Sequence, residues 1–321
     1  VGFAVFLWDP FVLSKGSAFR RALLVPAFGT IFIAAIIIFH PFSTPGPDRR
    51  LHMEFLDVGQ GDSIFIKFPN GETMLVDGGG RTSYRNDDDE PFEPDRPSIG
   101  ETVASEFLWE KGYSRIDHLV GTHADADHIQ GLADVAANFQ IGMAWFGRPQ
   151  KDDPDQVRLE AVLDRHGVPV EGLTRGERFE VGGVVIEVLN PPPDVTGLWQ
   201  ENDRSIVLRL TYGARSFLLA GDIEQVAESE IIGPDLKADV VKVPHHGSHT
   251  SSTPAFVAST RPQFAIISVG RMSQFGHPHR EIVERWQSAG AEVLTTGNNG
   301  TISFSTDGQD LVVGTFVRSS D

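Results

Sequence analysis

The chain has 321 residues, a formal net charge of −17, 33 glycines, 20 prolines and no cysteine. This length accommodates one large domain or two, and without cysteine any bound metal must be held by nitrogen and oxygen ligands. The acidic balance argues against broad electrostatic binding to nucleic acid or anionic lipid, so a polyanionic substrate would need bound cations nearby.

The first 50 residues predict a membrane segment and a linker. Residues 22–47 contain no charged side chain, and the apolar run within residues 22–42 is long enough for one membrane-spanning helix. A secretory signal peptide fits less well, because the run is too long and begins too far into the chain; a buried core helix is the other alternative. We interpret residues 1–42 as the end of a larger membrane region and residues 43–50 as a linker.

Positive side chains flank this apolar run on both sides. Lys15, Arg20 and Arg21 precede it, and Arg49 and Arg50 follow it. The small excess before the run favours a cytoplasmic N-terminal side. We therefore expect a membrane-anchored protein with residues 51–321 on the outer face.

Residues 51–321 are predicted to form one layered domain, because strands dominate early and then alternate with helices. The expected strands cover residues 51–58, 63–68, 73–76, 116–121, 183–189, 205–212, 216–220, 239–243, 263–269, 292–295, 300–305 and 311–316. The expected helices cover residues 98–112, 155–166, 226–232 and 254–260, one stretch beginning at Ile129 and one ending at Ala289. We also expect a hairpin turn at Asn70-Gly71, a capping box from Ser98 and Glu101, and pairing of strands 292–295 and 300–305.

The central motif lies in residues 120–131. It contains His123-x-Asp125-x-Asp127-His128, four potential metal ligands in six positions, between the end of a predicted strand and the start of a predicted helix. A strand end that leads into a helix directs several side chains into one cavity above a sheet. Imidazole together with carboxylate suits Zn²⁺, Mn²⁺ or Fe²⁺. The alternative is an acidic, solvated loop with incidental histidines.

Histidines gather in three short stretches near predicted strand ends. Seven of the 11 lie there: His123, His128, His245, His246, His249, His277 and His279. Carboxylates follow two further strands, at Asp77 and Asp222. This clustering favours a metal site, although an ordinary structural role fits His249 and His279 equally well. The glycine-rich stretches 57–63 and 77–80 are either tight turns or parts of the site.

Together these motifs resemble the metallo-β-lactamase superfamily. The resemblance is carried by His123-x-Asp125-x-Asp127-His128, Gly221-Asp222 and Pro244-His245-His246-Gly247-Ser248. The stretches Asp57–Ser63 and Gly276-His277-Pro278 look like one branch of it, the ComEC-type DNA-uptake channel proteins, in which such a domain follows a polytopic membrane region. Over residues 50–305 the resemblance implies a four-layer αββα sandwich with a dinuclear site at one edge of two sheets.

The resemblance also implies roles for individual residues. The metal ligands would be His123 and Asp125 for one ion and Asp127 and His128 for the other, with Asp222 bridging both and His246 or His245 completing the second site. Catalytic roles would fall to Asp127, His245, His246 and His277. Supporting or substrate-contacting roles would fall to Asp57, Asp62, Asp77, Asn202, Ser248 and His249.

Two positions depart from the family pattern. Asp125 stands where the family usually has its second histidine, and the usual third-motif histidine is absent near residues 202–205, where Asn202 or Asp203 is the candidate replacement. This harder ligand set shifts the expected pair of divalent ions toward Mn²⁺ and leaves Zn²⁺ open. Weak binding at the first site is a further alternative.

The implied function is a metal-dependent phosphodiesterase that hydrolyses DNA, the non-imported strand, within a membrane DNA-uptake protein. Single-stranded DNA is the expected ligand, and other DNA-uptake proteins are expected partners. Two alternatives stay open: a metallohydrolase acting on a phosphocholine-type ester or a lactone, and a non-catalytic binding or gating domain. The scattered side chains of Arg148, Lys151, Arg158 and Arg271 do not discriminate between them.

Overall fold

The computed structural model describes residues 26–36, 45–81, 97–147, 153–194, 199–233 and 236–317. The chain divides into two compact units, Val1–Pro45 with Lys111–Tyr113, and Gly46–Glu110 with Ser114–Asp321.

The first unit contains a helix at residues 26–36. Its side chains of Phe28, Ile31, Phe32 and Ile33 are 58–67% exposed. Within the described residues, no helix is both long enough and apolar enough to cross a membrane. The predicted spanning helix over residues 22–42 is therefore not confirmed; its residues 22–25 and 37–42 lie outside the described part of the chain.

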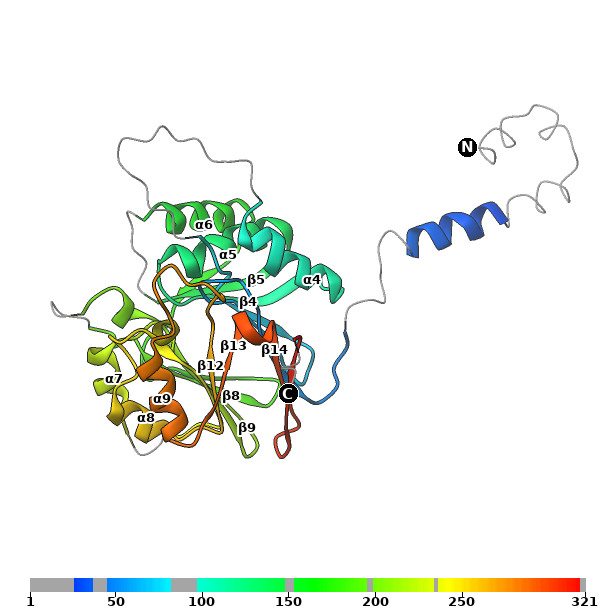
Figure 1. The fold of residues 1–321 in the computed structure, drawn as a ribbon. Coiled ribbons are helices and arrows are strands. Elements are labelled where there is room, and N and C mark those ends of the chain that lie inside the picture. The colour runs from blue at the N-terminus through cyan, green and yellow to red at the C-terminus, as the bar shows by residue number, and fades with distance from the viewer. Residues whose placement is uncertain are drawn as a thin grey trace, which may run out of the picture. The chain divides into compact units, whose positions relative to one another are not determined.

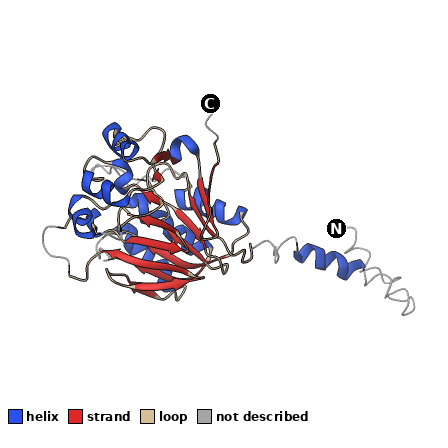
Figure 2. Cartoon of the chain, turned by 90° about the horizontal axis from the view of Figure 1, so that it is seen from below, coloured by secondary structure: helices blue, strands red, loops and turns tan. Residues whose placement is uncertain are grey.

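The second unit contains two sheets with helices packed outside them (Figure 1 and Figure 2), as predicted. The eight-stranded sheet has the order β15-β14-β1-β2-β3-β4-β5-β6, and the seven-stranded sheet has the order β13-β12-β11-β10-β9-β8-β7. The first comprises β1 (Leu51–Phe55), β2 (Ile64–Lys67), β3 (Thr73–Val76), β4 (Arg115–Gly121), β5 (Gln140–Phe146), β6 (Val170–Gly172), β14 (Ile302–Thr306) and β15 (Leu311–Thr315). The second comprises β7 (Arg178–Val181), β8 (Val184–Asn190), β9 (Val207–Tyr212), β10 (Arg215–Leu219), β11 (Val240–Lys242), β12 (Phe264–Ile267) and β13 (Glu292–Thr295).

The main hydrophobic core lies between the two sheets. Alternate residues of β1 and β8 are fully buried, and they pack there with Phe217 and Phe304. A second cluster joins the other face of the seven-stranded sheet to α7 (Gln225–Ile231), α8 (Pro254–Thr260) and α9 (Arg280–Ser288). Strands β11 and β12 are buried at every position, because both of their faces are covered.

The helix that carries the central motif starts earlier than predicted. Helix α5 covers Ala126–Asn138 instead of beginning at Ile129, so Asp127 and His128 belong to its first turn. A carboxylate near a helix N-terminus is favourable because the free backbone N–H groups and the helix dipole attract negative charge. Helix α6 (Pro154–Arg165) packs beside α5.

The predicted helix over residues 98–112 has two parts. Residues Gly100–Ser105 form a π-helical segment, and α4 covers Glu106–Glu110. The backbone N–H of Glu101 donates to Ser98 Oγ at 3.1 Å, which is one half of the predicted capping box. The predicted hairpin turn at Asn70-Gly71 joins the antiparallel strands β2 and β3.

The predicted pairing of the strands near residues 292–295 and 300–305 is wrong. Strand β13 pairs in parallel with β12, whereas β14 lies in the other sheet between β1 and β15. The short helix α10 (Thr296–Asn299) connects β13 in one sheet to β14 in the other.

Strand β5 was not expected from the sequence, because Gly142 interrupts its apolar pattern. A Cβ at Gly142 would lie 2.6 Å from the carbonyl oxygen of Asp117.

Candidate metal centre

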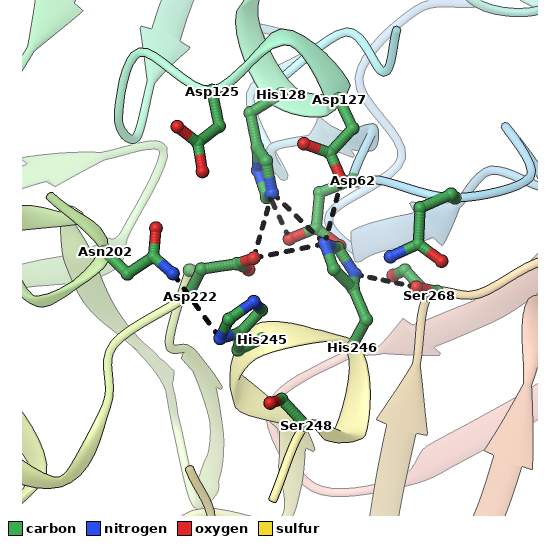
Figure 3. Close-up of polar contacts among 12 residues, drawn as sticks. Asp62, Asp125, Asp127, His128, Asn202, Asp222, His245, His246, Ser248 and Ser268 are labelled. Carbon is green, nitrogen blue, oxygen red and sulfur yellow. Dashed lines mark hydrogen bonds and ion pairs between the residues drawn. The ribbon is translucent and has the colours of Figure 1, made fainter. Parts of the chain in front are cut away.

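The candidate site lies where loops from the two sheets meet. The loops after β1, β3 and β4 supply Asp62, Asp77 and the central motif, and the loops after β10, β11 and β12 supply Asp222, the His245-His246 pair and Ser268. Figure 3 shows Asp127 and His128 pointing from one side toward Asp222 and His246 on the other. The carboxyl ends of neighbouring parallel strands meet at one edge of each sheet, which brings these side chains together.

Two buried histidines direct nitrogen lone pairs at each other. His128 Nδ1 lies 2.8 Å from Asp77 Oδ2, and His246 Nδ1 lies 2.8 Å from the carbonyl oxygen of Ser268. Each Nδ1 faces an acceptor and therefore donates, so in the neutral rings each Nε2 carries a lone pair. The two Nε2 atoms are 3.2 Å apart. Such a pair requires either a proton or a metal ion.

Carboxylates complete this convergence. Asp222 Oδ2 lies 3.3 Å from His128 Nε2 and 3.1 Å from His246 Nε2. Asp127 Oδ2 lies 3.5 Å from His246 Nε2. Among the described residues, potential ligand atoms form four overlapping clusters, in each of which the atoms lie within 4.8 Å of one another. The clusters are made of buried side chains: Asp62, Asp77, His123, Asp127, His128, Asp222 and His246.

His123 packs beside His128, with the two ring centroids 4.2 Å apart. His123 Nδ1 is 3.0 Å from Thr122 Oγ1, and its buried Nε2 has no hydrogen-bond partner. Asp125 Oδ2 lies 3.4 Å from that Nε2, and the Asp125 side chain is 46% exposed. Asp125 belongs to none of the compact clusters among the described residues, so this ion position would depend more on His123 and Asp222.

Asp77 supports the site through two neighbours. Its Oδ1 accepts the backbone N–H of Thr122 at 2.8 Å, and its Oδ2 accepts the Thr122 hydroxyl at 2.7 Å as well as His128 Nδ1–H. These bonds fix the orientation of the His128 ring, as groups behind metal ligands commonly do.

Lys242 is a site residue that the sequence interpretation missed. It is fully buried on β11, and its Nζ lies 3.0 Å from Asp222 Oδ1 and in close contact with Asp62 Oδ2. A single lysine inside the apolar strand Asp239–Val243 was the available signal, because a buried lysine needs a charged partner. Asp62, expected in a supporting role, is that partner together with Asp222.

A second group of polar residues forms beside the cluster. His245 Nδ1 lies 3.0 Å from Glu224 Oε1, which also accepts the Thr250 hydroxyl at 2.8 Å. Asn202 Nδ2 lies 3.4 Å from the same Glu224 oxygen (Figure 3 labels Asn202 and His245). Glu224 was also missed, although it follows Asp222 by two residues. The ring centroids of His245 and His277 are 5.7 Å apart.

Several predicted residues lie outside the compact clusters. Asp57 is exposed and accepts the backbone N–H of Gly59 at 3.3 Å. Ser248 Oγ contacts Thr250 Oγ1 at 2.9 Å, and His249 Nδ1 contacts His279 Nε2 at 2.9 Å. Asp203 accepts the backbone N–H groups of residues 224 and 227 at 3.0 Å, so it holds the start of α7 and does not replace the third-motif histidine.

The buried charges shift the pKa values of the central groups. Burial alone would lower the pKa of His246, but the carboxylates of Asp222 and Asp127 together outweigh it and raise that pKa to about 9. The pKa of His128 is raised for the same reason by Asp222 and Asp77, against the effect of burial. Burial and the neighbouring histidines lower the pKa of His277 to about 4. The cluster therefore attracts positive charge, either as protons or as metal ions.

The donor set fits a pair of divalent ions. Asp62 Oδ1 and His123 Nε2 are buried without hydrogen-bond partners. The Nε2 atoms of His128 and His246 face each other, and neither lone pair has a neutral hydrogen-bond donor as its partner. Buried polar atoms are almost always satisfied, so these donor atoms are suited to binding a cation. Nitrogen and oxygen donors together suit Zn²⁺ or Mn²⁺.

Sequence comparisons find two related competence proteins. The chain is 32% identical over 306 residues to ComE operon protein 3 of Bacillus subtilis, covering 94% of this chain and 39% of that protein. It is 24% identical to competence protein ComA of Neisseria gonorrhoeae, covering 88% of this chain and 36% of that protein. The chain thus spans less than half the length of these relatives.

Solved structures show a likeness of fold alone. The CmlA β-hydroxylase E377D mutant superposes with a TM-score of 0.50 at 16% identity, covering 81% of this chain and 54% of that chain. The family model of the metallo-beta-lactamase superfamily matches residues 56–271, which contain both sheets' site loops. The chain belongs to the metallo-β-lactamase superfamily, and it is similar to bacterial competence proteins.

Proposed function

We propose that this chain is a metal-dependent phosphodiesterase that hydrolyses DNA as part of a membrane DNA-uptake protein. The observation that carries the proposal is the pair of facing Nε2 atoms of His128 and His246, 3.2 Å apart, with Asp222 Oδ2 within 3.3 Å of both. The competence proteins among its relatives support DNA as the substrate.

Two of the compact clusters, His123 with His128 and Asp222, and Asp127 with His128 and His246, support a dinuclear centre. In the proposal His123, Asp222 and the more distant Asp125 would hold one ion, and Asp127, His128 and His246 would hold the other, with Asp222 shared. When bound, two divalent ions lower the pKa of a water molecule and offset the charge of a phosphodiester. That local positive charge is needed because the chain carries a net charge of −17.

The neighbouring histidines would handle the substrate. Because His245 Nδ1–H donates to Glu224, its Nε2 carries a lone pair in the neutral ring, and only as an imidazolium would it donate to a phosphate oxygen or to the leaving oxygen. Its side chain is 22% exposed, so a substrate can reach it. His277, half-buried beside it, is held neutral near pH 7 by its lowered pKa and would hydrogen-bond a substrate oxygen.

Membrane anchorage is part of the proposal. The exposed apolar side chains of Phe28, Ile31, Phe32 and Ile33 support contact with a lipid or protein membrane environment around residues 22–42. The phosphodiesterase unit would then lie on the outer face, where it meets incoming DNA before one strand is imported. Other DNA-uptake proteins are the proposed partners.

Cleavage assays test the activity. The 321-residue chain, purified in mild detergent, is incubated with labelled single- and double-stranded DNA in EDTA, Mn²⁺ or Zn²⁺. We expect metal-dependent cleavage that is lost in Asp127→Asn and His246→Ala and kept in Asp57→Asn, whose side chain lies outside the cluster. Metal content by mass spectrometry accompanies every variant.

Two other outcomes would replace the nuclease proposal. Two bound metals without DNA cleavage, but with turnover of a phosphocholine ester or a lactone, would identify a different metallohydrolase. Absence of bound metal would favour a binding or gating domain, which agrees with Asn202 standing near the place of the third-motif histidine.

A further inference from the structure

Lys242 lies beside the metal centre in a position that uses every one of its N–H groups. Its Nζ donates to the carbonyl oxygen of Gly221 at 2.8 Å, to Asp222 Oδ1 at 3.0 Å and to Asp62 Oδ2. Its side chain is 0% exposed. A lysine ammonium has three donors and no acceptor, so all of its hydrogen-bonding capacity is spent here.

Each carboxylate bound by Lys242 keeps its other oxygen for the site. Asp222 Oδ2 faces the Nε2 atoms of His128 and His246 at 3.3 and 3.1 Å. Asp62 Oδ1 is buried without a hydrogen-bond partner. Lys242 thus lies behind the metal ligands and contacts them from the β11 side.

Lys242 lies among several buried negative charges and few positive ones. Four carboxylates there, those of Asp62, Asp77, Asp127 and Asp222, are at most 8% exposed. Within the described residues, Lys242 is the one lysine or arginine that pairs with any of them. Several negative charges buried together are costly unless cations lie close to them.

We propose that Lys242 is a built-in counter-ion that keeps the carboxylate cluster folded before metal binds, at the expense of metal affinity. This inference rests on the proposed metal site. In the metal-free protein the ammonium offsets the buried carboxylates. Two divalent ions would carry enough positive charge to balance the four carboxylates, so the ammonium would then be surplus and would repel them. The chain would therefore fold without metal and take up metal afterwards.

The test compares Lys242→Met with the wild type, because methionine keeps most of the length and apolar volume of the lysine stem. Thermal unfolding of the 321-residue chain in detergent is followed by circular dichroism in EDTA and in Mn²⁺. In EDTA we expect the Tm of Lys242→Met to lie about 10 °C below that of the wild type, as for a broken buried ion pair. In saturating Mn²⁺ the difference in Tm between the two proteins should be smaller by half or more. By linkage, calorimetry should show Mn²⁺ binding about tenfold more tightly to Lys242→Met than to wild type.

Two control variants separate charge from packing. Lys67 is also buried, and its Nζ lies 3.0 Å from Asp48 Oδ2, outside the clusters. Lys67→Met should therefore lower Tm equally with and without Mn²⁺. The double variant Asp62→Asn with Lys242→Met removes one charge of each sign and should recover part of the Tm lost in EDTA.

The outcomes are distinguishable. An equal Tm loss with and without Mn²⁺, or weaker Mn²⁺ binding by Lys242→Met, would overturn the counter-ion role, since a packing or orienting lysine gives those results. If wild type and variant both bind no Mn²⁺ or Zn²⁺, the proposed function fails; a recovery of Tm by the double variant in EDTA would still support charge compensation by Lys242.

Discussion

His246 shows how burial and charge together determine the behaviour of a single side chain. Its pKa of about 9 lies above the value of 6.5 expected in the unfolded chain, because the carboxylates of Asp222 and Asp127 together outweigh the effect of burial. Its protonation therefore stabilises the metal-free fold fully below pH 6.5, and this contribution is lost as pH rises through 9.

We expect the free energy of unfolding of the metal-free protein to fall between pH 6.5 and 9, by about 3 kcal/mol from this group. Over the same range Mn²⁺ affinity should rise, because metal and proton compete for His246 Nε2. Urea unfolding in EDTA and calorimetry with Mn²⁺ measure the two trends. His246→Gln should flatten both, and an unfolding free energy independent of pH in wild type would contradict the prediction.

Asp77 orients His128, one of the proposed metal ligands. Changing Asp77 to Asn removes the carboxylate that accepts both Thr122 Oγ1–H and His128 Nδ1–H. We expect Mn²⁺ affinity to fall by about 10- to 100-fold, measured by calorimetry on folded protein. Asp57→Asn serves as the matched control, since that carboxylate is exposed; an equal effect of the two changes would refute a specific supporting role for Asp77.

The sequence predicted the candidate metal-binding side chains better than the residues that contact them. His123, Asp127, His128, Asp222 and His246 were found because imidazoles and carboxylates follow strands and cluster along the chain. Lys242 and Glu224 were missed because their role depends on the contact between loops far apart in the chain, which spacing does not show. The backbone carbonyl of Ser268, which accepts from His246, has no signature in the sequence at all.

At the scale of elements, glycines allow the first turn of α5 to approach two loops of the same sheet. A Cβ on Gly61 would lie 2.0 Å from Asp127 O, and one on Gly80 would lie 1.9 Å from Ala126 O. The backbone N–H of Asp62 donates to that same Asp127 oxygen at 3.2 Å. The position of the metal-binding turn therefore depends on these glycines.

Gly61→Ala should displace the start of α5. Both Gly61 and Gly59 have positive φ, at 112° and 80°, but a Cβ on Gly59 meets no atom within 4 Å. We expect Gly59→Ala to cost about 1 kcal/mol through backbone strain, and Gly61→Ala to cost more and to weaken Mn²⁺ binding. Chemical unfolding and calorimetry compare the two, and similar results for both would argue against the close approach.

Element types were more predictable than element partners. Nearly all of the predicted strands exist, because buried strands are rich in β-branched and aromatic residues. The partner of each strand was not predictable, since β14 returns to lie beside β1 after about 250 intervening residues. The same reason explains the wrong pairing of β13 with β14.

For the whole molecule, a net charge of −17 opposes a polyanionic ligand. We expect binding of single-stranded DNA to be undetectable in EDTA and to appear with Mn²⁺, measured by fluorescence anisotropy with the inactive Asp127→Asn chain. An equal affinity in EDTA would show that a basic groove, and not the metal centre, holds the DNA. His123→Ala, which removes a proposed ligand of the first ion position, should weaken the Mn²⁺-dependent binding of single-stranded DNA.

The division of the metal centre between two sheets has a consequence for how the protein is made. Residues 62–128 supply one half of the ligands, and Asp222 and His246 supply the other half about 100 residues later. A ribosome that has produced only the first sheet's loops has produced a chain with an incomplete set of donors. Metal binding at the proposed centre would thus report that the loops of the two sheets have come together, and a chain truncated before His246 would lack part of the donor set.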